Sequence, residues 1–185
     1  MTPATNLPHA VICSTRLATP LGSLVAAASD RGICMLEFAD PQRLPAQLAM
    51  LQRLSGMPVI PGEHPYLEQL HHELACYLAG QLTQFSVPLD SYGTAFQQRV
   101  WAAVAAVPYG GTSSYRAIAS ALGAPHAARA VGHANGRNRL AILIPCHRLI
   151  GADGKLIGYG GGIAVKRALL QLERHGRLSS EGHND

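Results

Sequence analysis

Short apolar runs separated by turn-forming residues fill the chain between Ala10 and Phe38. Two turns stand at positions 19–22 (TPLG) and 29–32 (SDRG), where proline, glycine and aspartate favour reversal of the chain. This pattern predicts an antiparallel meander of short strands. The segment 85–90 (FSVPLD) is expected to add a last strand to this half of the chain.

A helical period replaces the strand pattern between Pro65 and Gly80. Proline suits the first turn of a helix and glycine suits the position after its end, so these residues mark the limits of a predicted helix. One face of this helix carries leucines at positions 67, 70, 74 and 78. The preceding residues 40–61 contain four prolines and predict only one helix, between Pro45 and Leu54.

The second half of the chain is mainly helical. Thr94 is a suitable N-cap for a predicted helix over residues 96–107. A second helix is expected over 114–122, and a third over 126–134 with Pro125 in its first turn. Two short helices joined by a glycine-containing turn are typical of a helix-turn-helix.

The third of these helices has an unusual surface, in which small residues surround one long side chain, Arg129. The small residues are Ala127, Ala128, Ala130, Gly132 and Ala134. Small side chains let a helix approach another surface closely. The pattern alone leaves open whether that surface is a ligand or the core of the protein.

A cysteine and a histidine stand together after the apolar run 140–144 (LAILI), which is expected to form a strand. A thiol is mostly protonated at neutral pH and acts as a nucleophile only beside a base or a positive charge. Adjacent side chains of a strand point to opposite faces, so contact between Cys146 and His147 requires a turn, which Pro145 favours. Glycines at 158 and 160–162 follow and leave backbone N–H groups accessible to a flat ligand.

Glu173 lies in the last turn of a helix predicted over 163–175, where the helix dipole disfavours a carboxylate. Its position therefore indicates a role in the tertiary structure. The other cysteines, Cys13, Cys34 and Cys76, lie among apolar residues and form no CxxC pair. They are expected to be reduced, buried hydrophobic residues, with neither a disulfide framework nor a zinc ribbon.

Charge divides the chain more sharply than composition does. With 185 residues and 48% apolar content, the protein can bury one large core or two small ones. Residues 1–92 hold four Lys and Arg against seven Asp and Glu, whereas residues 93–174 hold ten against two. The basic half is typical of a domain that binds a polyanion, the alternative being a basic surface that is only solvated.

We expect an N-terminal domain over 1–92, a C-terminal domain over 93–174 and a disordered tail over 175–185, which is polar. The sequence has no apolar run long enough for a membrane span and no pattern of a secretory signal. These features predict a cytoplasmic protein that does not bind membranes.

Five motifs in the second half occur together and in a fixed order: FQQRVW at 96–101, PYGGTSSY at 108–115, AARAVGHANGRN at 127–138, IPCHRLIG at 144–151 and GYGGG at 158–162. In these motifs the chain resembles the O6-alkylguanine-DNA alkyltransferases. The likeness is weaker but collinear in the first half, where TPLGSL resembles an early hairpin of that family.

The resemblance implies an α+β fold, with a small RNase H-like N-terminal domain built on an antiparallel sheet and a mainly helical, winged helix-turn-helix C-terminal domain. It implies DNA repair by transfer of the alkyl group of O6-alkylguanine, and of O4-alkylthymine, to Cys146 after nucleotide flipping. This is the reaction of a methylated-DNA–protein-cysteine S-methyltransferase, which works once. Displacement at an alkyl carbon needs a thiolate and no cofactor.

The resemblance also assigns roles to individual residues. His147 acts with Glu173 through a water to deprotonate Cys146, and Asn138 supports the turn at the site. Tyr115 donates a hydrogen bond to the guanine, and Arg129 fills the gap left in the base stack. Further residues expected to bind substrate or DNA are Ala128, Asn135, Arg148, Leu149, Tyr159, Gly160 and Gly161.

The partner implied by the resemblance is double-stranded DNA that carries the lesion and is bound through its minor groove. We expect a monomer that binds DNA with cooperativity. Relatives often have Ser or Ala where Gly160 stands, so we expect tolerance of alkyl groups larger than methyl. Some relatives hold zinc in the first half, but Cys13 and Cys34 lack evident partner ligands and we expect none.

Three alternatives compete with this interpretation. A protein that only recognises alkylated DNA would lack the reactive cysteine, whereas Cys146 stands in an intact PCHR. A cysteine hydrolase with a Cys-His-Glu triad would leave Arg129 and the helix-turn-helix without a role. A winged-helix regulator would explain the basic charge but not the cysteine beside the glycine loop.

Overall fold

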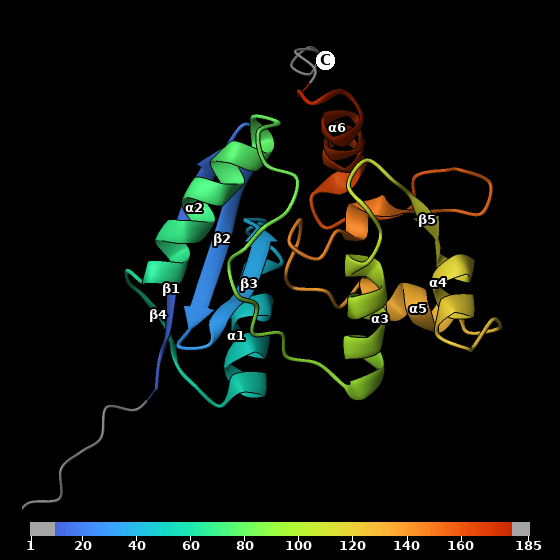
Figure 1. Cartoon of the computed structure of the whole chain (residues 1–185). Coiled ribbons are helices and arrows are strands. Elements are labelled where there is room, and N and C mark those ends of the chain that lie inside the picture. The colour runs from blue at the N-terminus through green and yellow to red at the C-terminus, as the bar shows by residue number, and fades with distance from the viewer. Residues whose placement is uncertain (1–9, 179–185) are drawn as a thin grey trace, which may run out of the picture.

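A computed structural model describes residues 10–178 and contains one four-stranded sheet with helices on both faces, followed by a mainly helical half (Figure 1). The sheet order is β3-β2-β1-β4. Strands β1 (Ile12–Thr19), β2 (Gly22–Ser29) and β3 (Gly32–Phe38) form the predicted antiparallel meander. The α+β class expected from the sequence is confirmed.

Two edges of the sheet differ from the prediction. The short strand β4 (Val59–Pro61) pairs in parallel with β1 and lies in the proline-rich segment, where no strand was expected. The segment 85–90 forms no strand and makes only an isolated bridge between Leu89 and Ile33. Its prediction as a strand was wrong because Pro88 lacks an N–H group and leaves only its carbonyl to accept from Ile33.

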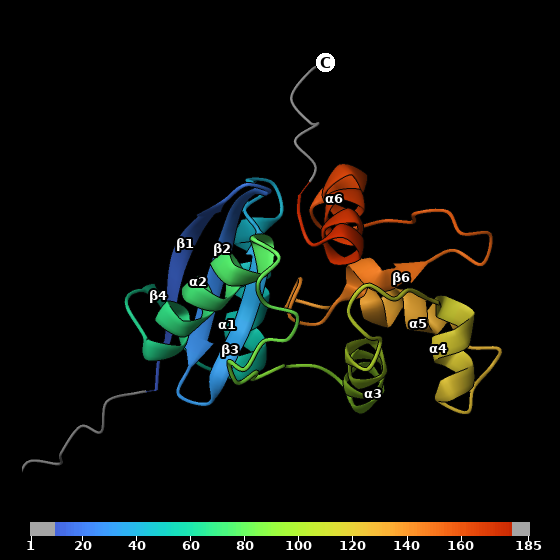
Figure 2. The same cartoon turned by 45° about the horizontal axis from the view of Figure 1, so that its top comes forward.

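Helix α2 (Pro65–Leu78) packs on one face of the sheet and helix α1 (Leu44–Ser55) on the other (Figure 2). Alternate residues of the strands therefore enter different apolar clusters: Ala26 and Leu36 face the leucines of α2, whereas Ala27 and Met35 face Leu51 of α1. Because both faces are covered, the central strands are continuous apolar runs.

The second half begins with α3 (Ala95–Ala105), whose N-terminus has a complete capping box between Thr94 and Gln97. Helices α4 (Tyr115–Ala121) and α5 (Ala128–Asn135) form the predicted helix-turn-helix. The indole of Trp101 on α3 donates to the carbonyl oxygen of Ala134 at 2.9 Å and joins α3 to α5. The strands β5 (Ser113–Ser114) and β6 (Leu149–Ile150) pair in parallel beside these helices.

Two details of this half correct the sequence prediction. Helix α5 begins two residues later than expected, so Pro125 lies in the preceding turn and not in its first turn. The run 140–144 is not a strand but a series of buried turns, in which only Leu140 bridges to Leu36. Complete burial gives turns and strands the same apolar composition, so periodicity could not distinguish them.

The C-terminal helix α6 (Gly162–His175) ends later than the predicted start of the tail. His175 belongs to this helix and Gly176 caps it in the left-handed conformation, because the helix packs against the end of α2. The rest of the expected disordered tail, 179–185, lies outside the described residues. No helix within residues 10–178 is long and apolar enough to cross a membrane.

The two halves share one apolar core, since buried residues of α2, α3, α5 and α6 belong to a single cluster. The domain boundary at residue 92 therefore stays a prediction. Just after the end of α2, Gly80, with φ +73°, lies so close to Gly176 that a Cβ atom would overlap the carbonyl oxygen of Gly176.

We predict that Gly80→Ala destabilises the protein by about 3 kcal/mol, because it combines left-handed backbone strain with a backbone clash at the α2–α6 contact. Gly123→Ala is the matched control, since Gly123 has φ +74° but no atom within 4 Å of its Cβ position. Its expected loss is about 1 kcal/mol. Urea unfolding of both variants measures the difference, and equal losses would refute the close approach.

Candidate active site

Cys146 stands in a one-turn 3-10 helix, η1 (Cys146–Arg148), at a cavity of about 650 Å³. Burial raises the pKa of the Cys146 thiol to about 11, although a hydrogen bond with Asn138 and the charge of Lys166 act in the opposite direction. The thiol is therefore protonated at neutral pH. It needs a base to become a nucleophile.

Asn138 fixes the turn that presents the thiol. Its side-chain amide donates to the carbonyl oxygen of Ile144 at 2.9 Å and accepts from the N–H of Leu140 at 2.9 Å. These bonds close the loop of buried turns from both ends and satisfy backbone groups that no strand partner reaches. The sequence prediction that Asn138 supports this turn is consistent with both contacts.

His147 is fully buried, and its Nε2 lies 2.7 Å from Oε1 of Glu173 on α6. Burial lowers the pKa of His147 from its ordinary value, and the opposing effect of Glu173 does not reverse this. The imidazole is therefore neutral at pH 7. Because Glu173 is an ionised acceptor, Nε2 carries the proton and the lone pair resides on Nδ1.

Nδ1 of His147 has no hydrogen-bond partner among residues 10–178. Its lone pair is thus available to accept a proton from a neighbouring group. Cys146 is the adjacent residue and carries the only thiol that lines the cavity. The tautomer set by Glu173 therefore makes His147 a suitable base for this thiol.

Glu173 is an ionised carboxylate held by five donor atoms from four residues. Arg148 donates from Nε to Oε2 and from Nη2 to Oε1, both at 2.9 Å, and the N–H of Gly110 donates to Oε2 at 3.0 Å. Oε1 also accepts from His147 and from Tyr77. Although burial acts in the opposite direction, the hydrogen bonds from His147 and Arg148 lower the pKa of Glu173 to about 2.

Arg148 differs from its expected role in binding substrate or DNA. Its guanidinium is buried beside Glu173, and Nη1 donates to the carbonyl oxygen of Val107 at 2.5 Å. Leu149 is likewise buried behind the cavity, where its carbonyl oxygen accepts from Lys166 at 2.6 Å. Every donor of Arg148 that forms a hydrogen bond is thus directed to the protein interior.

The helix-turn-helix supplies one wall of the cavity. Tyr115, at the first turn of α4, lies 3.8 Å from the Cβ position of Gly132 on α5. Burial, followed by the nearby Cys146, raises the pKa of Tyr115, so its phenol remains a donor. Ala128, Asn135 and the exposed Arg129 line the same wall.

The glycine loop supplies the opposite wall together with the first half of the chain. The carbonyl oxygen of Gly160 accepts from Arg43 at 3.0 Å, and a Cβ on Gly161 would lie 2.8 Å from the ring of Phe38. Tyr159 lines the cavity between them. Gly161 is therefore required by close packing against β3.

Four residues near the site were not found from the sequence: Glu37, Arg43, Tyr77 and Lys166. Burial raises the pKa of Glu37, on the cavity wall, to about 7, against the influence of Arg43 and Arg139. Lys166 shares a face of α6 with the buried Leu169 and Glu173. This spacing was the one feature of the sequence that could have shown that Lys166 is buried. The positions of Glu37 and Arg43 follow from chain packing alone.

Among residues 10–178 no group of three or more His, Cys, Asp or Glu side chains gathers in a way that could hold a metal ion. Cys34 is buried, whereas Cys13 and Cys76 are partly exposed, which differs from the expectation that all three are buried. The absence of zinc stays a prediction for metal analysis.

We predict that Glu173→Gln lowers the free energy of unfolding by about 3 kcal/mol at pH 7, because it leaves the buried Arg148 without its counter-charge. The pKa of Glu173 is lowered in the folded state, so its contribution exists above the ordinary pKa of Glu and disappears as pH falls towards 2. Urea unfolding from pH 7 to pH 3 should therefore show a shrinking difference. Glu63→Gln, at an exposed carboxyl, is the control and should change stability by less than about 0.5 kcal/mol.

Known proteins share both halves of this arrangement. A family model described as 6-O-methylguanine DNA methyltransferase, ribonuclease-like domain, matches residues 12–91, and one described as its DNA binding domain matches residues 95–175. A methylated-DNA–protein-cysteine methyltransferase of Mycobacterium leprae is 46% identical over 162 residues, covering 88% of this chain and 92% of that protein. One of Mycolicibacterium paratuberculosis is 59% identical over 156 residues, covering 84% and 88%.

The likeness extends to the fold. The crystal structure of the Mycobacterium tuberculosis OGT in complex with DNA superimposes with a TM-score of 0.76 at 44% identity, covering 90% of this chain and 95% of that one. The expected RNase H-like and winged helix-turn-helix halves agree with these matches. Both family models match in order and together cover most of the sequence, so the chain belongs to the 6-O-methylguanine DNA methyltransferase family.

Proposed function

We propose that this protein repairs alkylated DNA by moving the alkyl group of O6-alkylguanine, and of O4-alkylthymine, to Cys146 in a single irreversible transfer. The observation that carries the proposal is the thiol at the cavity together with a neutral, buried His147 whose Nε2–H is bound to Glu173. In this arrangement His147, oriented by Glu173, can accept the proton of Cys146 and so generate a thiolate at the cavity. Membership of the methyltransferase family supports the same reaction.

The chemistry is a displacement at the alkyl carbon. Nδ1 of His147 takes the thiol proton through a water, and the resulting imidazolium is stabilised by Glu173. The sulfur of Cys146 then forms a bond to the alkyl carbon while the bond from that carbon to O6 of guanine breaks. The electron pair passes to the guanine, where the phenol of Tyr115 donates a hydrogen bond to the base and stabilises the developing charge.

The product is a thioether on Cys146, which water does not readily hydrolyse. One molecule therefore repairs one lesion. The reaction needs no cofactor, since the thiol is both nucleophile and acceptor.

DNA would reach the thiol only after the damaged nucleotide rotates out of the duplex. Arg129 is exposed at the cavity and has the length to fill the gap left in the base stack. The small residues of α5, Ala128 and Gly132 among them, permit close docking in the minor groove. We infer that Asn135, Tyr159, Gly160 and Gly161 line the space for the base, and that basic residues of the second half contact phosphates.

The binding unit in this proposal is a cytoplasmic monomer that binds double-stranded DNA with cooperativity. Mass measurement of the protein–DNA complex at increasing protein concentration would measure the oligomeric state of the protein and the cooperativity of its binding to DNA. The roles of Arg148 and Leu149 become structural, because one holds Glu173 and the other binds Lys166.

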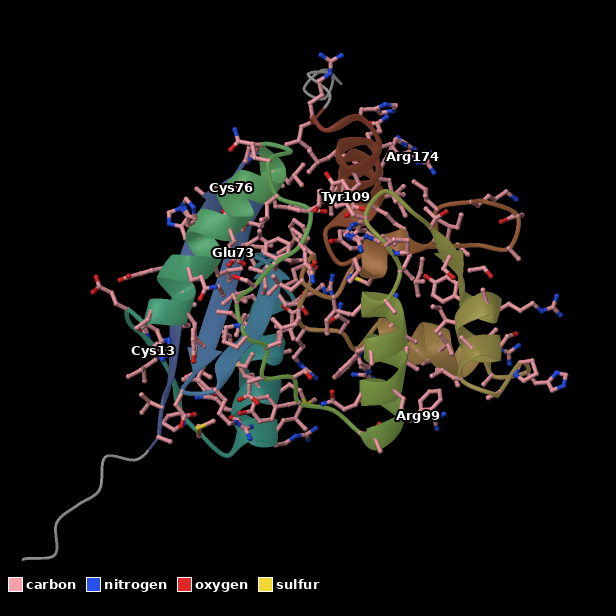
Figure 3. All side chains as sticks on the ribbon, in the orientation of Figure 1. Cys13, Glu73, Cys76, Arg99, Tyr109 and Arg174 are labelled. Carbon is pink, nitrogen blue, oxygen red and sulfur yellow. The ribbon has the colours of Figure 1, made fainter. Side chains whose placement is uncertain are left out.

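Intact-protein mass after incubation with a duplex holding one O6-methylguanine tests the transfer. Wild type should gain one methylene mass and then stop at one equivalent, whereas Cys146→Ala should gain none. Cys76→Ala is the control, because Cys76 is partly exposed on α2 and should leave the gain intact (Figure 3). Lesion binding without any mass gain in wild type would indicate a recognition protein, and repeated ester turnover would indicate a hydrolase.

Gly160→Ser tests the predicted tolerance of large alkyl groups. The added Cβ would lie 3.7 Å from Glu37 and 3.9 Å from Arg43, so the variant should fold without a clash. We expect the transfer rate on O6-benzylguanine in DNA to fall about tenfold, a difference of about 1.4 kcal/mol, with little change on O6-methylguanine. Equal benzyl rates in the two proteins would refute a role for the space at Gly160.

A further inference from the structure

One phenol from the first half of the chain reaches the catalytic network of the second half. Tyr77, in the last turn of α2, is 1% exposed, and its hydroxyl donates to Oε1 of Glu173 at 2.6 Å. The phenolic oxygen of Tyr77 also lies 3.5 Å from Nε2 of His147. Tyr77 thus contacts both groups that act on the thiol, although it is far from them in sequence.

The position of Tyr77 is fixed by its surroundings. Its ring packs edge-to-face on Tyr109, with centroids 6.1 Å apart, and in a tilted arrangement on Phe85 at 5.1 Å. The contact between Gly80 and Gly176 brings the ends of α2 and α6 together just beyond it. The phenol is therefore held by packing, and Glu173 is the carboxylate that it meets.

The hydroxyl can act only as a donor to this carboxylate. Burial and the neighbouring Glu173 raise the pKa of Tyr77 well above its ordinary value, so the phenol stays protonated. Oε1 of Glu173 accordingly accepts from Tyr77, from His147 and from Arg148. An oxygen shared by three donors attracts the imidazole proton less strongly than one shared by two.

This sharing matters because a base must be neutral before it can accept a proton. If Glu173 attracted the imidazole more strongly, it would stabilise the protonated ring, and Nδ1 would carry a proton instead of a lone pair. We propose that Tyr77 is a positioning residue of the alkyl-transfer site, which keeps His147 neutral and in its Nε2–H tautomer by donating to Glu173. The inference rests on the proposed function for its kinetic consequence only.

The other groups around His147 do not replace Tyr77. On α6, Lys166 lowers the pKa of His147 by its charge and Glu173 raises it, while Arg148 in η1 lowers it. The ring of Tyr159 packs edge-to-face on His147 at 6.3 Å. The titratable and charged groups that face His147 are thus Tyr77, Arg148, Tyr159, Lys166 and Glu173. Tyr77 is the neutral donor to the oxygen that binds Nε2.

Tyr77→Phe removes the hydroxyl and keeps the ring packing. Single-turnover transfer from O6-methylguanine in duplex DNA should be more than about twofold slower than wild type at pH 6 and equal to it within about twofold at pH 8.5. The reason is that loss of the hydrogen bond to Glu173 raises the pKa of His147, so less of the imidazole is neutral and able to accept a proton at the lower pH. A uniform loss across pH, or an unchanged profile, would overturn the proposal.

Tyr109→Phe is the matched control, because Tyr109 lies beside α6 and its ring packs on Tyr77 (Figure 3). No hydrogen bond joins its hydroxyl to Glu173 among the residues described. Its profile should retain the wild-type pH dependence. A shift equal to that of Tyr77→Phe would show that loss of any phenol here perturbs the site, and would contradict the assigned hydrogen bond.

Nuclear magnetic resonance of the imidazole nitrogens decides the question without DNA. The His147 signal, identified by its loss in His147→Gln, should report the Nε2–H tautomer and a titration midpoint below that of an ordinary histidine in wild type. The midpoint should move upward in Tyr77→Phe. An Nδ1–H tautomer or an ordinary midpoint in wild type would refute the inference, whether or not the variant folds. Absence of alkyl transfer in wild type would reject the proposed function and leave this result valid.

Discussion

The carboxylate of Glu173 is the interaction on which the rest of this structure depends. A buried charge is tolerated only when it is paired and hydrogen-bonded, and here Arg148, His147, Tyr77 and the backbone of Gly110 all donate to it. These donors come from η1, from α2 and from the loop after α3. Satisfying one carboxylate therefore brings together three separate parts of the chain around the cysteine.

The hydrogen bonds to Glu173 also explain how the thiol of Cys146 can be protonated at rest and still have a neutral histidine as its neighbour in the chain. Burial keeps Cys146 protonated, with a pKa of about 11, so the thiol does not react with every electrophile that it meets. Arg148 already balances the charge of Glu173, and His147 can remain neutral beside it. A nucleophile used only once gains from such control, since an adventitious alkylation would consume the protein.

The first half of the chain contributes to the site and is more than a support. Tyr77 reaches Glu173 from α2, and Arg43 binds the carbonyl oxygen of Gly160 on the far wall of the cavity. Phe38, at the end of β3, packs so closely on Gly161 that there is no room for a side chain at this position of the glycine loop. The wall of the cavity beside Gly160 thus depends on the first half of the chain, which has no catalytic motif of its own.

Local sequence determined much of this molecule. The turns at 19–22 and 29–32 determined the meander, and the capping box of Thr94 began α3. The ordered motifs identified Cys146 and His147, and the position of Glu173 at a helix end marked it for a tertiary role before its contacts were known. The run 140–144 was wrongly predicted as a strand, because an apolar run buried on all sides has no periodicity that distinguishes strand from turn. The segment 85–90 was wrongly predicted as a strand because Pro88 has no N–H group to donate to a neighbouring strand. Tyr77, Glu37 and Arg43 were missed for a different reason. Tyr77 and Arg43 have their partners in the other half of the chain, and Glu37 lies near Arg139 from that half as well as Arg43. Only tertiary packing decides which distant groups meet in this way.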